Sequence, residues 1–205
     1  MREALTPELV IDAAVVMVER DGAAQLTMRK LAAELGVSAN TIYWHVGGRE
    51  QVLDAVIRRV GARLGEVEVE GRTPRDRIMS VARHIWTDLL ANQQVSALAH
   101  DRGHTTTLNL QLQLLLAREV TAAGLTGAEA ARAMRGILYA VGGLIVIAFR
   151  EQERMLPDRT PEATWAAVDD PAVDPGLVAA LSKPPDLDEL FEHTIGALVE
   201  AVIPV

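Results

Sequence analysis

Two short helices separated by a glycine turn restrict the fold of this chain more than any other feature. Thr27 can cap the first helix by accepting a hydrogen bond from its first turn, and Gly36 suits the left-handed position that ends it. Ser38 can cap the second helix in the same way. The expected helices run to Leu35 and from Ala39 to His45, and Gly47-Gly48 breaks the second. This spacing predicts a helix-turn-helix unit held against a longer preceding helix.

Longer amphipathic patterns lie on both sides of this unit, and strands have no comparable signal. Six of the nine prolines fall in one acidic stretch, which predicts an irregular loop with at most a short helix at Gly176 to Leu181. We expect an all-α chain, with an N-terminal helix-turn-helix three-helix bundle in residues 1–64 and a larger C-terminal helical domain in residues 65–205. The other expected helices are Pro7 to Asp21, one from Arg49, one from near Pro74, Thr106 to Ala123, Gly127 to Arg154 and Leu187 to Ile203.

Composition excludes several kinds of chemistry. The chain has no cysteine, which removes disulfides, thiolate nucleophiles and cysteine-based metal sites, and we expect neither a cofactor nor a metal. A net charge of −8 excludes a polycation that coats nucleic acid or anionic membrane. The apolar stretch without charged residues from Gly136 to Phe149 has 14 residues, fewer than the ~20 of a spanning helix, and predicts a buried helix. Charged residues near the N-terminus do not fit a signal peptide, so we expect a cytoplasmic protein with no membrane partner.

The second short helix carries side chains suited to reading DNA. Hydroxyl, amide and aromatic donors can contact base edges and phosphates, and this helix offers them at Asn40, Thr41, Tyr43, Trp44 and His45. Residues 25–64 include six basic and three acidic residues, whereas the rest of the chain from Gly65 carries −8. Phosphate would therefore be attracted to this unit and repelled elsewhere. The alternative is that Tyr43 and Trp44 merely cover the bundle.

A longer motif includes both short helices. It reads Leu26-Thr27-Met28-Arg29-Lys30-Leu31-Ala32-Ala33-Glu34-Leu35-Gly36-Val37-Ser38, followed by Thr41-Ile42-Tyr43-Trp44-His45-Val46 and Arg49. It resembles the DNA-binding domain of the TetR family, and within that family the tetracycline repressor class. The resemblance implies that the second short helix enters the DNA major groove. It also implies roles: Arg29 would reach a guanine, Asn40 and Thr41 would lie near bases or sugars, Thr27, Tyr43, His45 and Arg49 would hold phosphates, and Trp44 would do both.

Two positions depart from that class. Ala39 stands where the class has a base-reading glutamine, and Arg49 replaces a lysine. A different operator sequence is therefore expected.

The resemblance further implies a homodimer, formed by two C-terminal helices of each chain. The candidate surfaces are Gly127 to Arg154 and Leu187 to Ile203. Glycines in the first would let helices approach closely, at Gly136, Gly142 and Gly143. The second has an apolar stripe at helical spacing: Leu190, Phe191, Thr194, Leu198 and Val202. The same residues could equally form a core within one chain, and the two arrangements are compatible.

A small-molecule effector is the other partner that the resemblance implies. An effector site needs an apolar lining with a few polar groups, and the expected set is Val81, Ile85, Trp86, Leu89, His100, Gln113, Leu138 and Val141. The tetracycline repressor class uses a histidine, an asparagine and a phenylalanine where this chain has Gly65, Val81 and Ile85, and an acid where it has Arg150 or Glu151. Recognition of a magnesium–tetracycline complex is therefore not expected.

The resemblance implies a transcriptional repressor that binds a near-palindromic, double-stranded operator and releases it when an effector enters the C-terminal domain. Two other classes stay open: a helical small-molecule binding protein without a regulatory role, and a small-molecule enzyme using His84, His100 or His104. We do not expect an enzyme, because none of the four serines lies in a Gly-x-Ser-x-Gly elbow. A zinc ion shared by His100 and His104 is disfavoured, since Gly103 opposes a helix there.

Overall fold

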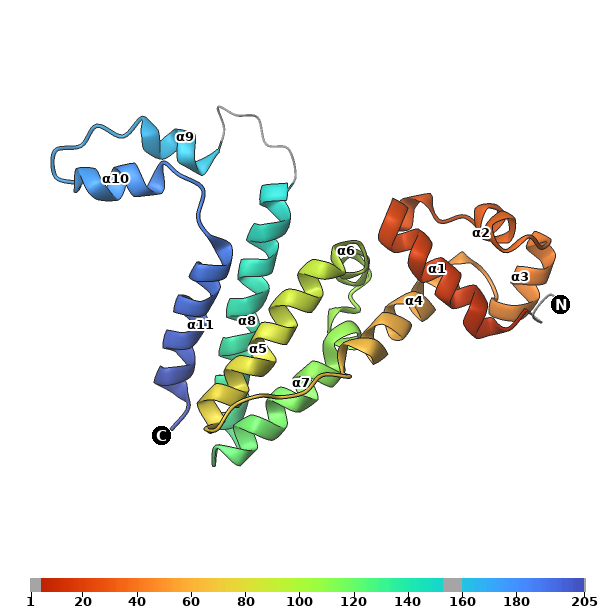
Figure 1. Cartoon of the computed structure of the whole chain (residues 1–205), viewed down its shortest axis with the longest axis horizontal. Coiled ribbons are helices and arrows are strands. Elements are labelled where there is room, and N and C mark those ends of the chain that lie inside the picture. The colour runs from red at the N-terminus through yellow and green to blue at the C-terminus, as the bar shows by residue number, and fades with distance from the viewer. Residues whose placement is uncertain (1–4, 153–159, 205) are drawn as a thin grey trace.

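The computed structural model describes residues 5–152 and 160–204, without the side chains of residues 150–152. Every regular element in these residues is a helix, which confirms the expected all-α fold (Figure 1). The N-terminal elements are α1 (Pro7–Asp21), the 3-10 turn η1 (Ala23–Gln25), α2 (Met28–Leu35), α3 (Ala39–Val46) and α4 (Arg49–Leu64). The C-terminal elements are α5 (Pro74–Ala91), α6 (Gln93–Asp101), α7 (Thr105–Ala122), α8 (Gly127–Gln152), α9 (Pro161–Ala166), α10 (Pro175–Leu181) and α11 (Leu187–Val202).

The helix starts follow the capping residues that the sequence predicts. The hydroxyl of Thr6 accepts a hydrogen bond from the Leu9 amide at 3.3 Å, at the start of α1. At the start of α5, Thr73 accepts from the Asp76 amide at 3.2 Å, and the Asp76 carboxylate accepts from the Thr73 amide at 3.0 Å. This reciprocal capping box starts the helix that was expected from near Pro74.

Two helices form that the sequence did not predict. α6 buries Val95, Leu98 and Ala99, which have helical spacing, and it packs against α4 and α7. α9 forms inside the proline-rich stretch, because Pro161 stands at the first helical position, where proline costs no hydrogen bond. Residues 153 and 154, expected at the end of α8, lie outside the described residues, as do the side chains of Arg150 and Glu151.

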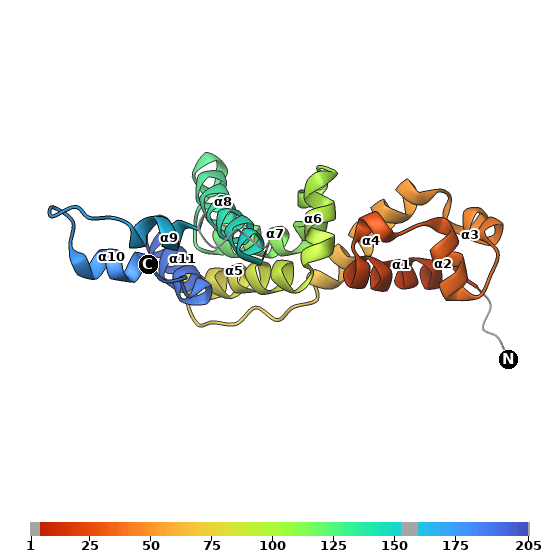
Figure 2. The same cartoon turned by 90° about the horizontal axis from the view of Figure 1, so that it is seen from above.

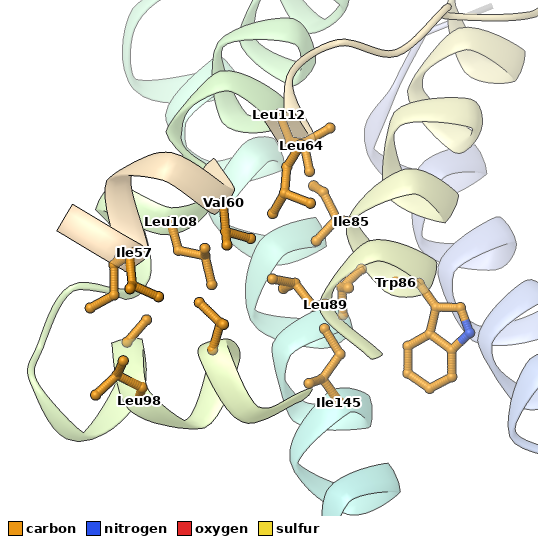
Figure 3. Packing of buried hydrophobic residues seen from close by; sticks show 14 of the residues in the cluster. Ile57, Val60, Leu64, Ile85, Trp86, Leu89, Leu98, Leu108, Leu112 and Ile145 are labelled. Carbon is orange, nitrogen blue, oxygen red and sulfur yellow. The ribbon is translucent and has the colours of Figure 1, made fainter. Parts of the chain in front are cut away.

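The hydrophobic core is continuous from one end of α4 to the other. Its first turns bury Val52, Leu53 and Val56, and α4 packs extensively against α1. Toward its end, Val60 and Leu64 point at Leu108 and Leu112 of α7 (Figure 3). All of these residues belong to one cluster of buried side chains. α4 therefore belongs to the cores of both expected domains.

Two glycines one turn apart set how closely α4 crosses α7. A Cβ atom on Gly61 would lie 2.6 Å from the Leu108 carbonyl oxygen, and one on Gly65 would lie 2.2 Å from the Cβ of Gln111. Real Cβ atoms do not approach other atoms so closely. Any side chain at either position would thus force the two helices apart.

α11 is held along the outer side of α5 by polar and aromatic contacts. The indole of Trp86 stacks on Phe191 with ring centroids 5.1 Å apart, and its Nε1 donates to the Asp188 carboxylate at 2.8 Å. Arg83 pairs with Glu192 at 2.5 and 2.7 Å. Phe191, expected in an apolar stripe for dimerisation, is thus 1% exposed within its own chain.

α8 is long and apolar, and it is only partly covered. By length and composition alone, residues 127–149 could cross a membrane, with a mean hydropathy of 1.6 over the most apolar stretch. This is longer than the 14 uncharged residues on which the expectation rested, because mean hydropathy tolerates single charges. The helix packs against α5, α7 and α11. Only 33% of that stretch is buried, so the buried helix expected here keeps an exposed side.

The two ends of the molecule differ in how many of their side chains are buried. The helices α1 to α3 lie at one end, and α9 and α10 extend from the other (Figures 1 and 2). α9 and α10 pack against each other, but neither has a buried residue.

Candidate nucleic-acid interface and effector region

The turn between α2 and α3 has the geometry that its glycine and serine predict. Gly36 ends α2 in the left-handed conformation, with φ 65° and ψ 34°, a region that favours glycine over other residues. The Ser38 hydroxyl then accepts a hydrogen bond from the Thr41 amide at 3.2 Å and starts α3. Gly47, with φ 75°, ends it. These contacts hold the two short helices in a defined orientation across the turn.

One face of α3 is exposed and the opposite face is buried. Ile42 is fully buried, whereas Tyr43 is 51% and Trp44 82% exposed. Asn40, one turn before Trp44, is exposed on the same face. Trp44 therefore does not cover the bundle, and the exposed face carries an amide, a phenol and an indole.

The other residues expected to contact DNA are placed less freely. Thr41 shares a hydrogen bond of 2.9 Å with the Ser38 hydroxyl, and Thr27 caps α2 by accepting from the Lys30 amide at 3.2 Å. His45 is half-buried, with its ring edge-on to Trp44 at 4.9 Å between centroids. Ala39 is half-buried against the core. It offers at most a methyl group to a base.

The arginines of this region differ in whether they form ion pairs within the protein. Arg59 pairs with Asp12 at 2.7 Å, and Arg63 pairs with Glu19 at 3.3 Å, so acids of α1 neutralise two basic residues of α4. Over residues 1–64 the basic and acidic residues are equal in number, which removes the net positive charge expected from residues 25–64 alone. Arg29 is exposed and has no ion pair within the described part of the chain. It is the basic side chain on α2 that is best placed to reach a ligand.

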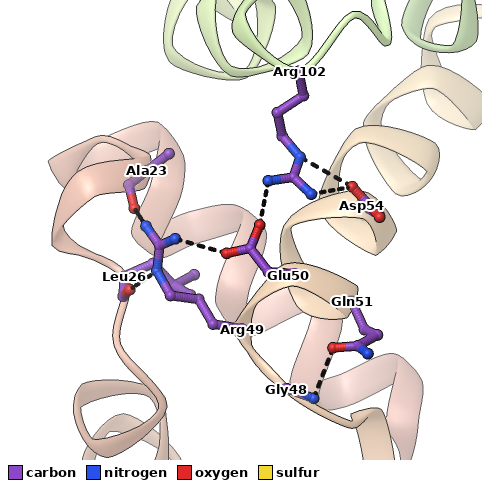
Figure 4. Close-up of polar contacts among 8 residues, drawn as sticks. All are labelled: Ala23, Leu26, Gly48, Arg49, Glu50, Gln51, Asp54 and Arg102. Atoms are coloured by element: carbon purple, nitrogen blue, oxygen red, sulfur yellow. Dashed lines mark hydrogen bonds and ion pairs between the residues drawn. The ribbon is translucent and has the colours of Figure 1, made fainter.

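Arg49, an expected phosphate ligand, is bound to the protein backbone. Its Nε donates to the Leu26 carbonyl at 2.9 Å and its Nη2 donates to the Ala23 carbonyl at 2.8 Å (Figure 4). Its Nη1 donates to Glu50 at 3.1 Å. In this structure the guanidinium thus holds the chain that leads into α2.

The residues expected to line an effector site do not converge on one cavity. Ile85 and Leu89 face the interior beside Ile145 of α8, whereas Trp86 points the other way, toward α11 (Figure 3). Val81 and Val141 are fully buried, and Leu138 is half-buried. His100 is exposed on α6 and lies apart from this core.

Gln113 is half-buried and its amide donates to the side chain of Asn109, a residue 7% exposed at a kink in α7. This pair adds a polar group to an otherwise apolar interior. Surface clefts of the described residues include one of about 370 Å³ and one of about 430 Å³. The first lies beside α5 and the second between α1 and α2, and neither is lined by any of the eight expected effector residues.

Sequence reasoning missed a set of charged residues that joins α4 to α6. Arg102, at the end of α6, donates to Glu50 and Asp54 of α4 at 2.6 to 3.0 Å (Figure 4). No local pattern marks these residues, because Arg102 lies 48 and 52 positions away from its partners.

Comparison with known proteins gives matches to one family. Residues 10–56 match the model of the family described as "Bacterial regulatory proteins, tetR family". A curated HTH-type transcriptional regulator of Saccharopolyspora erythraea is 38% identical over 101 residues, 48% of this chain and 42% of that protein. The class D tetracycline repressor of Escherichia coli is 35% identical over 92 residues, 45% of this chain and 38% of the repressor. The chain thus matches about two-fifths of the length of these relatives.

Solved structures extend the similarity to almost the whole fold. Apo ActR of Streptomyces coelicolor superposes with a TM-score of 0.76 at 22% identity, covering 98% of this chain and 96% of that one. ActR in complex with actinorhodin gives 0.71 at 21% identity, covering 98% and 97%. At this identity the likeness establishes the fold.

The exposure of Trp44 predicts that it adds little to stability. Replacing Trp44 with alanine should change the free energy of unfolding by less than about 0.5 kcal/mol, as at most surface sites. Ile42→Ala, on the opposite face of the same helix, should lower it by roughly 2–5 kcal/mol because it leaves a cavity. Urea unfolding of both variants measures the two values. A loss at Trp44 comparable to that at Ile42 would show that the indole is part of the core.

Proposed function

The chain belongs to the tetR family of bacterial regulatory proteins, and from that premise we propose that it is a transcriptional repressor released from its DNA operator by a small molecule. The observation that carries the proposal is the exposed face of α3, where Asn40, Tyr43 and Trp44 project from a helix that a glycine turn holds in place. A large aromatic residue costs free energy when it is left in water, and it is suited to packing against sugars and base edges.

The proposed contacts with DNA follow from which side chains are exposed and which of their polar groups are not already bonded within the protein. Tyr43, Trp44 and Asn40 are exposed, and Arg29 lies exposed on the neighbouring helix. We assign contacts with DNA bases to Arg29 and Asn40, and contacts with the DNA phosphates to Tyr43 and His45. Trp44 is assigned both kinds of contact. Thr27 contributes through the hydroxyl that also caps α2, and Thr41 through a hydroxyl that also bonds the Ser38 hydroxyl, which is the cap of α3. Ala39 supplies only a methyl group, which fits an apolar contact with a thymine.

Selection from a random duplex library tests DNA binding directly. The purified chain should enrich a near-palindromic sequence whose half-sites lie about one helical turn apart. Failure to enrich any sequence, together with tight binding of a small molecule, would instead support the alternative of a helical binding protein without a regulatory role.

Arg29 is predicted to read a base. Arg29→Ala should cost roughly 1–3 kcal/mol of affinity at one base position of the selected sequence and relax specificity there, because a bidentate contact with guanine is lost. Arg118→Ala, which removes an exposed arginine from α7, is the matched control and should leave affinity unchanged. Competition binding with single-base variants of the selected DNA measures the effect. Equal weakening on every sequence would make Arg29 a phosphate contact.

The uncovered sides of α8 and α11 support the homodimer. Tyr139 is 74% exposed, and Val146 and Ile147 are each 46% exposed, although all three lie in an apolar helix. A Cβ atom added to Gly136, Gly142 or Gly143 would meet no atom within 4 Å, so their small size serves no contact inside the chain. A second copy packed on this surface would bury the apolar residues and use the glycines for close approach.

A charge on this surface should prevent dimerisation. Val146→Asp would place a carboxylate in the proposed interface without disturbing the core, and it should yield a folded monomer that no longer binds the selected DNA. Val16→Asp is the control, since Val16 is 55% exposed on α1. Sedimentation with circular dichroism distinguishes loss of assembly from loss of folding. If the Val146→Asp variant still forms a dimer, the interface does not include this surface.

We further propose a largely apolar effector that enters between α5, α7 and α8 and uses the Gln113–Asn109 pair as its polar anchor. The interior beside Ile85 and Leu89 is lined by aliphatic side chains. ActR, which has a similar fold, has been solved with the small molecule actinorhodin, and this supports a small-molecule site in the present chain. A histidine at position 65 has no space beside Gln111, which argues against binding of magnesium–tetracycline in the manner of the tetracycline repressor class.

Effector binding and DNA binding should oppose each other by the same factor. An effector should weaken affinity for the selected DNA by roughly 5–150-fold, and that DNA should weaken effector binding equally. Titration of the complex with actinorhodin, with a panel of apolar compounds and with magnesium–tetracycline measures the release. Release by magnesium–tetracycline would contradict the interpretation of Gly65, Val81 and Ile85.

A further inference from the structure

A chain of charged hydrogen bonds runs from α6 to the connection that leads into α2. Arg102 bonds Glu50 and Asp54, Glu50 bonds Arg49, and Arg49 holds two backbone carbonyls just before Thr27 (Figure 4). We propose that Arg102, although it belongs to the C-terminal domain, is a positioning residue for DNA binding, because it fixes the helix-turn-helix unit relative to α6. The inference rests on the proposed function in that it assumes the unit binds DNA.

Arg102 uses its whole guanidinium in these contacts. Nη1 donates to Glu50 Oε2 at 2.6 Å, while Nε and Nη2 both donate to Asp54 Oδ1, at 3.0 and 2.7 Å. The Arg102 side chain is 23% exposed and that of Asp54 is 30% exposed, so water screens the contact with Asp54 less than it screens a surface pair. A planar fork that spans two carboxylates one turn apart on α4 fixes direction as well as distance.

Glu50 joins the two arginines with its two carboxylate oxygens. Oε2 accepts from Arg102 and Oε1 accepts from Arg49 at 3.1 Å. The hydrogen bond from Arg102 keeps the pKa of Glu50 below its ordinary value, so the carboxylate stays ionised near neutral pH. Arg49 then continues the connection from α4 to the Ala23 and Leu26 carbonyls.

Apolar packing alone would leave this orientation poorly defined. α4 meets α7 through aliphatic side chains, whose attraction depends little on direction, and its ion pairs with Asp12 and Glu19 of α1 lie within the N-terminal elements. The hydrogen-bonded chain adds directional contacts at the end of α4 nearest α2. If α6 shifts, Arg102 shifts with it, and the entry to α2 is displaced through Glu50 and Arg49.

The experiment compares Arg102→Ala with Arg77→Ala. Arg77 also forms a partly buried ion pair, with Glu119 at 2.6 Å, but that pair joins α5 to α7 and does not touch α4. For the DNA enriched by the unaltered protein, Arg102→Ala should lower affinity about ten-fold, the scale of coupled networks. Affinity for unrelated DNA and the dependence on salt should stay unchanged. Arg102→Lys should bind with intermediate affinity, since one ammonium cannot span both carboxylates.

A distance measurement tests the same inference without DNA. Because the chain has no cysteine, spin labels can be placed at Ala33→Cys on α2 and Arg118→Cys on α7, with labelled chains diluted in unlabelled ones. The distance distribution should broaden or shift in Arg102→Ala and stay as in the unaltered protein in Arg77→Ala.

Three results would overturn the proposal: unchanged affinity and distances in Arg102→Ala, equal losses in Arg77→Ala, or a uniform loss on all DNA with a smaller salt dependence, which would make Arg102 a phosphate contact. If the unaltered protein enriches no DNA, the proposed function fails while the distances still decide whether Arg102 positions the unit.

Discussion

The close crossing of α4 and α7 is the constraint on which the rest of this structure depends. Gly61 and Gly65 bring the α4 backbone against α7, so that the last turns of α4 are buried among residues of the C-terminal bundle. The direction in which α4 leaves this crossing decides where α1, α2 and α3 lie, since α1 packs on α4 while α2 and α3 pack on α1 (Figure 1). Two residues that have no side chain therefore help to set the direction of the exposed face of α3, and the Arg102 contacts add to that constraint.

The sequence predicted those parts of the fold that local signals specify. Thr6, Thr27, Ser38 and Thr73 start helices where expected, because a capping hydroxyl acts within three residues of its own position. α9 was missed because a cluster of prolines usually breaks helices, whereas Pro161 opens one. α6 was missed because its end resembles a loop, although its buried residues have helical spacing.

The candidate site was predictable to the same extent. The exposed face of α3 follows from helical spacing around Ile42, and the motif itself carries the family resemblance. The Arg102 contacts and the backbone role of Arg49 did not follow, because they join residues that only the tertiary fold brings together. Charge counting over residues 25–64 left out Asp12 and Glu19 of α1, which pair with two of the counted arginines. The contact between Trp86 and Phe191 also joins residues that are far apart in the sequence. The apolar pattern of α5 alone could therefore not show that Trp86 turns toward Phe191 and away from Ile85.

The continuous core has a consequence for how the molecule melts. A module with its own core can unfold alone, and a two-domain chain then loses structure in two steps. Here Val60 and Leu64 of the N-terminal elements are buried only while α7 is folded beside them, and α7 in turn loses part of its cover when α4 leaves. The two halves should therefore lose structure in a single cooperative transition. An excised N-terminal half would carry an apolar stripe into water, so exchange of that half between related chains requires a matching α7 surface in the recipient.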